Sequence, residues 1–296
     1  MLVEAGDADV VVADYMLPGA LCGAEASFRP SVALVHTLYA ALLDGDGGLL
    51  PMHMAATVDG VAAVRAELGL APVASFGALL DRQACVLVTS PEALDDPAPP
   101  RAANVRYVGP VLEDAGSDAG WRPPGVDDGR PIVVVGLGTT PMDEGPVLQR
   151  LLTALGDAPV RVIATIGDHL DPADLTVPPN VHVAGYVRHA ALLPWASAVV
   201  SHAGLGTVLA ALAHGLPLVC VPLGREQPPN AAAVERVGAG CTLEPTASPE
   251  AIRAAVSRAV TDMDLRAGAA RMALAIDTQR AAAVPEVEIE RLADLP

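Results

Sequence analysis

The chain has 296 residues, of which 52% are hydrophobic, so it can form a sizeable core and is not disordered as a whole. Its formal net charge of −17, with only 18 lysines and arginines, argues against nucleic acid or an anionic membrane as a partner. Its four cysteines lack C-x-x-C spacing, which argues against a metal site or a disulfide framework and fits a reducing cytoplasm.

Short apolar runs rich in β-branched residues alternate with helical patterns along the whole chain. This alternation is typical of parallel sheets covered by helices, so the sequence predicts an α/β fold. A stretch without charged residues, 189–224, is cut into short pieces by proline and glycine, which favours buried strands and helices over a membrane span. The predicted strands occupy 9–14, 31–36, 84–90, 131–136, 160–166, 180–186, 196–202 and 216–223.

The amino-acid composition also indicates where the domain boundaries of the chain lie. Between Ser90 and Pro131 it shifts to proline, aspartate and glycine, which indicates an exposed linker. The first half contains too few βα units for a complete Rossmann-like domain, whereas the second half carries a full alternation. The predicted divisions are an incomplete first domain at 1–115, a linker at 116–130, a second domain at 131–277 and a tail helix at 278–296.

The segment 201–240 carries the strongest functional signal. An apolar strand ends at His202, and Gly204 and Gly206 form a turn that opens a helix. Such a turn points unpaired backbone N–H groups and the positive end of the helix dipole at a phosphate. We predict that His202 and the backbone and hydroxyl groups of Thr207 bind a diphosphate, although a histidine after an apolar strand is, by itself, more often a core residue.

A polar pair, Glu226 and Gln227, follows about twenty residues later, after another strand. Carboxylate and amide groups there are suited to the adjacent hydroxyls of a sugar carried by the phosphates. Without the preceding strand and glycine turn, the same pair would indicate only a solvated loop before a helix.

The segment resembles the nucleotide-sugar signature H-G-G-x-G-T…P-x-x-x-D-Q-x-x-N-A of the GT-B glycosyltransferases that modify macrolides, flavonoids and other natural products. Gln227 and Asn230 stand at the family's spacing and favour the ligand-binding role of His202. The resemblance implies two Rossmann-like domains with parallel sheets, the N-terminal one incomplete here. Ala203 replaces the first glycine of the turn, and Glu226 replaces the usual aspartate.

The resemblance also implies further donor contacts. Thr139, in the turn after the strand at 131–136, is expected near the diphosphate, although a threonine cap of a tight turn explains it equally well. Val187 is expected to meet the nucleobase through its backbone. The family commonly has a glutamate for the ribose hydroxyls where this chain has Ala210.

For catalysis, the resemblance implies inverting displacement without a metal or cofactor, from a UDP- or dTDP-sugar to a small hydrophobic acceptor. Asp14 matches the aspartate that orients the catalytic histidine, although it could equally cap the next helix. That histidine is expected in a segment of about ninety residues missing from the front. His36 has no motif that assigns it a role.

Two other hypotheses stay open. The chain could be a catalytically incomplete nucleotide-sugar-binding protein or a truncated glycosyltransferase, so whether it acts as an enzyme is not settled by its sequence. A sugar epimerase or a cell-wall glycosyltransferase of the same two-domain fold is a weaker alternative, which fold analogy alone does not separate. The sequence gives no oligomeric state.

Overall fold

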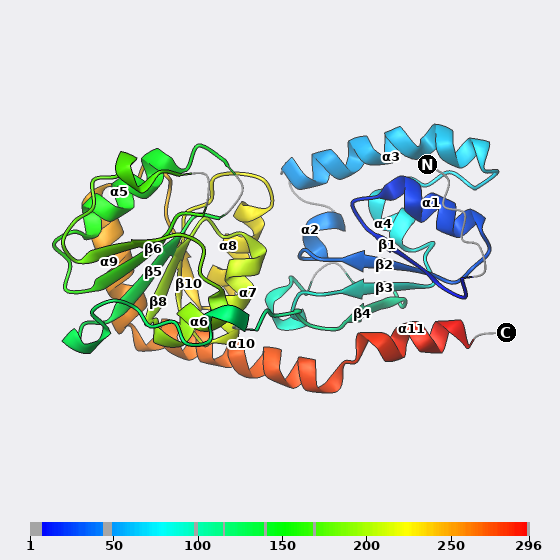
Figure 1. Ribbon diagram of the computed structural model, residues 1–296. Helices are drawn as coiled ribbons and strands as arrows, with labels where there is room; N and C mark the ends of the chain where they lie inside the picture. The colour runs from blue at the N-terminus through cyan, green and yellow to red at the C-terminus, as the bar shows by residue number, and fades with distance from the viewer. Residues whose placement is uncertain are drawn as a thin grey trace. The chain divides into compact units, whose positions relative to one another are not determined.

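The computed structural model describes residues 8–43, 49–97, 100–114, 116–138, 141–167 and 170–294. They form two compact units, each an α/β unit with one parallel sheet (Figure 1). The first unit combines the chain up to Pro110 with the segment from Ile276 onward, and the second comprises Val111–Ala275. The predicted linker, 116–130, thus groups with the second unit and contains two short 3-10 turns, η2 (Gly116–Asp118) and η3 (Val126–Asp128).

The first unit has a four-stranded sheet in the order β1-β2-β3-β4. One face of this sheet packs against the helices that follow β1 and β2, and the other packs against the last helix of the chain. The elements are β1 (Val11–Asp14), α1 (Pro18–Ala26), β2 (Ser31–Val35), α2 (Ala40–Leu43), α3 (Leu49–Glu67), α4 (Phe76–Leu80), β3 (Cys85–Val88), η1 (Glu92–Leu94), β4 (Val105–Tyr107) and α11 (Pro285–Ala293).

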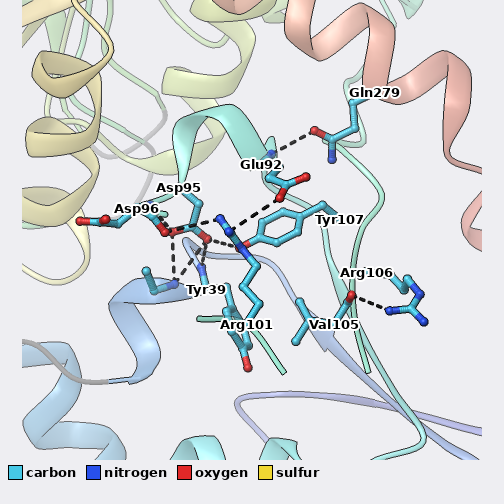
Figure 2. Close-up of polar contacts among 10 residues, drawn as sticks. Tyr39, Glu92, Asp95, Asp96, Arg101, Val105, Arg106, Tyr107 and Gln279 are labelled. Carbon is cyan, nitrogen blue, oxygen red and sulfur yellow. Dashed lines mark hydrogen bonds and ion pairs between the residues drawn. The ribbon is translucent and has the colours of Figure 1, made fainter. Parts of the chain in front are cut away.

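A polar cluster fixes the segment that follows β2 (Figure 2). The carboxylate of Asp95, 2% exposed, accepts hydrogen bonds from the backbone N–H of Tyr39 at 2.7 Å and of Ala40 at 3.2 Å. It also accepts one from the Tyr107 hydroxyl at 2.7 Å, and that hydroxyl accepts one from Arg101 Nε at 2.8 Å. Because these groups come from three separate segments, the chain around the start of α2 is held from several sides.

A buried ion pair joins α1 to α3 in the same unit. The guanidinium of Arg65, 1% exposed, contacts the Glu25 carboxylate at 2.8 Å and donates to the Ala71 carbonyl through Nε at 2.8 Å. These partners satisfy the charge that burial would otherwise leave unpaired.

The second unit has a six-stranded sheet in the order β10-β9-β8-β5-β6-β7. Helices α5 and α9 cover one face, and α7 and α8 lie on the other (Figure 1). The elements are β5 (Ile132–Gly136), α5 (Gly145–Leu155), β6 (Arg161–Thr165), η4 (Pro172–Asp174), β7 (Val181–Ala184), α6 (His189–Leu192), η5 (Leu193–Trp195), β8 (Ala198–Ser201), α7 (Leu205–Ala213), β9 (Leu218–Cys220), α8 (Gln227–Arg236), β10 (Gly240–Thr242) and α9 (Pro249–Thr261).

The strand order of the second sheet reverses between β5 and β8. The chain runs outward from β5 through β6 to β7 and then returns to place β8 on the other side of β5, with Gly136 in register with Ser201. In open parallel sheets, ligands bind outside the carboxyl ends of the strands at such a reversal. The turns that follow these two strands are therefore the expected site.

Every predicted strand is present in the structure, and so is the predicted N-cap Ser248, whose hydroxyl accepts from Ala251 N–H. The strands β4 and β10 were not predicted because three residues are too few for a recognisable pattern. The predicted helix at 265–277 is part of a longer helix, α10 (Met263–Ala282). Within the described ranges, no helix combines the length and the hydrophobicity needed to span a bilayer.

Candidate functional site

A pocket of about 530 Å³ lies in the second unit, beyond the carboxyl ends of β5 and β8. Its lining brings together the predicted residues of three separate loops, although their roles remain predictions. Thr139 lies outside the described residues. The predicted residues that line the pocket are Val187, His202, Gly204, Gly206, Thr207, Glu226 and Gln227.

The imidazole of His202 lies between two glycine turns. A Cβ atom built on Gly138 would lie 2.9 Å from Cε1 of the imidazole, and one built on Gly204 would lie 2.5 Å from its Nε2. Gly138 also has a φ of +100°, a conformation that side chains rarely allow. Both turns therefore need glycine for the ring to occupy this place.

The surroundings of His202 favour its neutral form. Burial lowers the pKa of this imidazole, and the carboxylates of Glu226 and Glu144 oppose that shift only in part. Its Nδ1 is buried and has no hydrogen-bond partner among the described residues. A neutral imidazole carries one N–H donor, so it can bind a phosphate oxygen without carrying a charge of its own.

The turn after His202 is fixed by its neighbours. Ala203 has a φ of 65°, its N–H donates to Ser201 Oγ at 3.1 Å, and its carbonyl accepts from Asn230 Nδ2 at 3.0 Å. Gly204 then serves as the N-cap of α7 without any side-chain cap. The first backbone N–H groups of α7 are consequently open to an anion.

The two polar residues at the start of α8, Glu226 and Gln227, differ in their hydrogen-bond partners. Gln227 is 1% exposed, and its Oε1 accepts from the backbone N–H groups of Leu223 at 2.7 Å and Gly224 at 3.1 Å. Its amide oxygen is therefore occupied, and a sugar hydroxyl can use only its Nε2, which lies 3.2 Å from Met142 Sδ. Glu226 lines the pocket as the N-cap residue of α8, and its carboxylate has no hydrogen bond within the described chain.

Glu113 is a pocket residue that sequence reasoning missed. Its carboxylate accepts from the backbone N–H of His189 at 2.8 Å and from the Tyr186 hydroxyl at 3.2 Å, which fixes the loop that carries Val187. Nε2 of His189 in turn lies 3.5 Å from Thr207 Oγ1. Glu113 lies in a segment with no motif, and its contacts reach more than seventy residues along the chain.

In the first unit, Asp14 ends β1 and lies beside a histidine. Its Oδ2 is 3.1 Å from His36 Nε2, and its Oδ1 accepts from Met16 N–H at 2.8 Å. The alternative that Asp14 caps the next helix is wrong, because the N-cap of α1 is Leu17 and no side chain caps it. Asp14 thus contacts His36, and its role as an orienting aspartate stays a prediction.

Within the part of the chain that the structure describes, no group of three or more histidine, cysteine, aspartate or glutamate residues could hold a metal ion. All four cysteines are free thiols.

Residues 149–293 match the family described as erythromycin biosynthesis protein CIII-like, C-terminal domain. The chain is 38% identical over 173 residues to the 4'-demethylrebeccamycin synthase of Lentzea aerocolonigenes and 36% identical over 171 residues to the tylactone mycaminosyltransferase of Streptomyces fradiae. These matches cover 57% and 54% of this chain, but only 40% and 37% of the two relatives.

Solved structures match nearly the whole chain. The crystal structure of CalG4, the calicheamicin glycosyltransferase, aligns with a TM-score of 0.80 and 28% identity over 99% of this chain and 76% of that one. The glycosyltransferase VinC in complex with dTDP aligns with a TM-score of 0.69 and 23% identity over 97% of this chain and 72% of that one. The two units thus share the architecture of these proteins.

Proposed function

We propose that this chain, which belongs to the GT-B glycosyltransferases of natural-product biosynthesis, transfers a sugar from a dTDP- or UDP-sugar to a small apolar acceptor with inversion at the anomeric carbon. The observation that carries the proposal is the pocket in which His202, the open start of α7 and Glu226 converge. The relatives named for sugar transfer and the dTDP held by VinC support it.

The pocket offers separate donors for the charged and the neutral parts of such a substrate. The N–H groups of Gly206 and Thr207 and the neutral imidazole of His202 would bind the diphosphate. As the bond to the sugar breaks, these donors would stabilise the charge on the departing diphosphate, so we propose that no metal or cofactor is needed.

The sugar would be bound beside the start of α8. The carboxylate of Glu226, which has no hydrogen bond among the described residues, can accept hydrogen bonds from adjacent hydroxyls, and Nε2 of Gln227 can donate one. The loop with Val187, held by Glu113, also lines the pocket and would meet the nucleobase. A site built from such hydrogen bonds discriminates strongly between sugars.

The proposed partners and location follow from charge and chemistry. A net charge of −17 supports a small-molecule acceptor over a nucleic acid, and the free thiols support a reducing, cytoplasmic setting. The acceptor would be bound by the first unit, where Asp14 and His36 lie.

Calorimetric titration with dTDP and UDP tests the donor site. We expect micromolar binding of one of them by the wild-type chain and a loss of about tenfold or more in His202→Ala, since the imidazole is a direct donor. His182→Ala is the matched control, because His182 lies on β7 and outside the lining of the pocket.

Absence of binding by a folded wild-type chain would contradict the proposal. Binding without sugar transfer to any acceptor would favour the alternative of a nucleotide-sugar-binding protein. Sugar transfer at the wild-type rate by the His202→Ala variant would show that His202 is not part of the donor site.

A further inference from the structure

The pocket of the second unit contains a carboxylate that lies outside the nucleotide-sugar signature. Glu113 lines this pocket, and it belongs to the same compact unit, Val111–Ala275, as the other lining residues. It precedes residues 149–293, the part of the chain that matches the family. The role of Glu113 therefore has to be inferred from its own contacts.

The side chain of Glu113 is fixed by the segment that follows β7. Its Oε1 accepts from the backbone N–H of His189 at 2.8 Å, and its Oε2 accepts from the Tyr186 hydroxyl at 3.2 Å. Arg188 adds a charge contact, with its Nη1 3.7 Å from Oε2 of Glu113. Three residues of one short segment thus hold the carboxylate in one orientation.

The carboxylate of Glu113 can still accept a hydrogen bond from a ligand. Two carboxylate oxygens together offer about four lone-pair positions, so the hydrogen bonds from His189 and Tyr186 leave some of them free. The side chain of Glu113 is 30% exposed, and the residue lines the pocket. A hydrogen-bond donor of a bound ligand can therefore reach it.

The charge of Glu113 selects the part of a nucleotide that it can bind. A carboxylate accepts hydrogen bonds from hydroxyl groups and repels phosphate oxygens, which carry the same charge. The diphosphate is therefore excluded as its partner. A pyrimidine base offers few N–H donors, and the backbone of Val187 is proposed to meet that base. The ribose, in contrast, offers hydroxyl groups.

The position of Glu113 also fits the ribose. The imidazole of His189, whose backbone N–H binds Glu113, has its Nε2 3.5 Å from Thr207 Oγ1. Glu113 thus lies where the loop proposed for the nucleobase approaches the start of α7, which is proposed for the diphosphate. Because the ribose joins these two parts of the nucleotide, it must lie between them.

Helix α7 does not supply a carboxylate at this place. Ala210 lines the pocket three residues after Thr207, on the same face of the helix. The family commonly has a glutamate at this position for the ribose hydroxyls, whereas the methyl group of Ala210 cannot accept a hydrogen bond. Glu113 is a carboxylate of the same pocket that can take over this task.

We propose that Glu113 binds the 3′-hydroxyl of the ribose, an inference that rests on the proposed binding of a dTDP- or UDP-sugar. The hydroxyl donates to the carboxylate, and this bond holds the nucleoside between the segment 186–189 and α7. Both dTDP and UDP carry a 3′-hydroxyl, so the assignment does not depend on the nucleobase. Glu113 thereby provides the acceptor that Ala210 lacks.

Nucleotides without the 3′-hydroxyl test the assignment. In the full chain, calorimetry measures the Kd of dTDP, of UDP and of the 3′-deoxy analogue of each. Loss of the hydroxyl should weaken binding by the wild-type chain by about tenfold to a hundredfold, because a hydrogen bond to a charged group is lost. In Glu113→Ala, the same loss should change the Kd by less than about threefold.

Three further variants serve as comparisons. Glu113→Gln keeps a side-chain oxygen without the charge, so the effect of the 3′-hydroxyl should be intermediate. Asp114→Ala removes the same charge from the next residue, which does not line the pocket, and should keep the wild-type ratio of Kd values. Tyr186→Phe removes one hydrogen bond between Glu113 and the loop but leaves the carboxylate, and it should also keep that ratio.

The ratio of the two Kd values separates a direct contact from support of the loop. If Glu113 only held the segment 186–189, its removal would weaken a nucleotide and its 3′-deoxy analogue equally. An unchanged urea midpoint in each variant would show that the fold persists.

A wild-type ratio in Glu113→Ala would overturn the assignment. So would a wild-type chain that binds each nucleotide and its 3′-deoxy analogue equally well, and both results would leave the donor pocket standing. Failure of the wild-type chain to bind either dTDP or UDP would instead overturn the proposed function itself.

Discussion

The two units place a histidine at the same point of a parallel sheet but give it opposite surroundings. His202 follows β8, and burial between two glycine turns lowers its pKa. His36 follows β2, has a side chain 46% exposed, and contacts a carboxylate. The comparison teaches that the end of a parallel strand can supply the position of a histidine, whereas its surroundings differ: two glycine turns enclose His202, and a carboxylate and an exposed face adjoin His36.

The two positions also differ in what holds them. In the second unit, backbone atoms come so close to His202 that only glycine fits at Gly138 and Gly204. In the first unit, side chains such as Asp95 fix the segment that carries His36. The position of His202 should therefore be sensitive to side-chain atoms added to the neighbouring glycines. The stability of the first unit should instead be sensitive to the loss of hydrogen bonds.

The largest effect is expected when the buried cation of the first unit is removed. Arg65→Ala leaves Glu25 without its partner and should lower the free energy of unfolding by about 3–5 kcal/mol. Urea unfolding measures the change, and Arg29→Ala is the control, because Arg29 is exposed and should shift stability by less than about 0.5 kcal/mol. Similar losses of stability in both variants would contradict the large contribution expected from the pairing of Arg65 with Glu25.

The next largest effect is expected from one carbon atom added beside His202 in the second unit. Gly204→Ala should weaken dTDP or UDP binding by about tenfold to a hundredfold, because the new Cβ displaces the imidazole of His202. Gly60→Ala is the control, since no atom lies within 4 Å of its Cβ position and Gly60 does not line the pocket, and it should stay within about threefold of wild type. Calorimetry that finds equal losses would refute the steric argument.

An effect of similar size comes from the polar cluster of the first unit. Tyr107→Phe removes the hydroxyl that bridges Arg101 and Asp95, and it should lower the free energy of unfolding by about 1.5–3 kcal/mol. An unchanged urea midpoint would show that the cluster does not stabilise this unit.

The smallest effect is a pH dependence. Burial lowers the pKa of His202 in the folded chain below its ordinary value of 6.5. Between the pKa of the folded state and that of the unfolded state, the unfolded chain therefore binds more protons than the folded chain. Stability should therefore fall as the pH drops below about 6.5, and less steeply in His202→Gln. Burial also lowers the pKa of His189, so some slope should persist in the variant. Urea midpoints at a series of pH values measure both slopes, and parallel curves would contradict the prediction.

Much of the fold follows from the sequence because buried parallel strands are continuous apolar runs. The run 131–136 becomes β5, and the run 196–202 becomes β8 with His202 at its tip. The glycine turn and the polar pair were also local patterns, and the structure brings them to one pocket. The pocket roles of these residues remain predictions.

The contacts that sequence reasoning could not reach are those between distant segments without a local pattern. Glu113 meets the loop at 186–189, and Asp95 meets Tyr39 and Tyr107, from stretches that read as linker or loop. The occupied amide oxygen of Gln227 was equally hidden, because hydrogen bonds to the backbone N–H groups of a loop depend on its three-dimensional path.

Ala203 occupies a left-handed conformation at the place where the family's turn has glycine. Alanine adopts this conformation at some cost, but it has fewer unfolded conformations than glycine, and Ser201 and Asn230 hold it from both sides. The turn thus loses most of its conformational entropy when the protein folds, before any nucleotide arrives. Less entropy would remain to be lost on binding, so the turn that we propose to bind the diphosphate is preorganised.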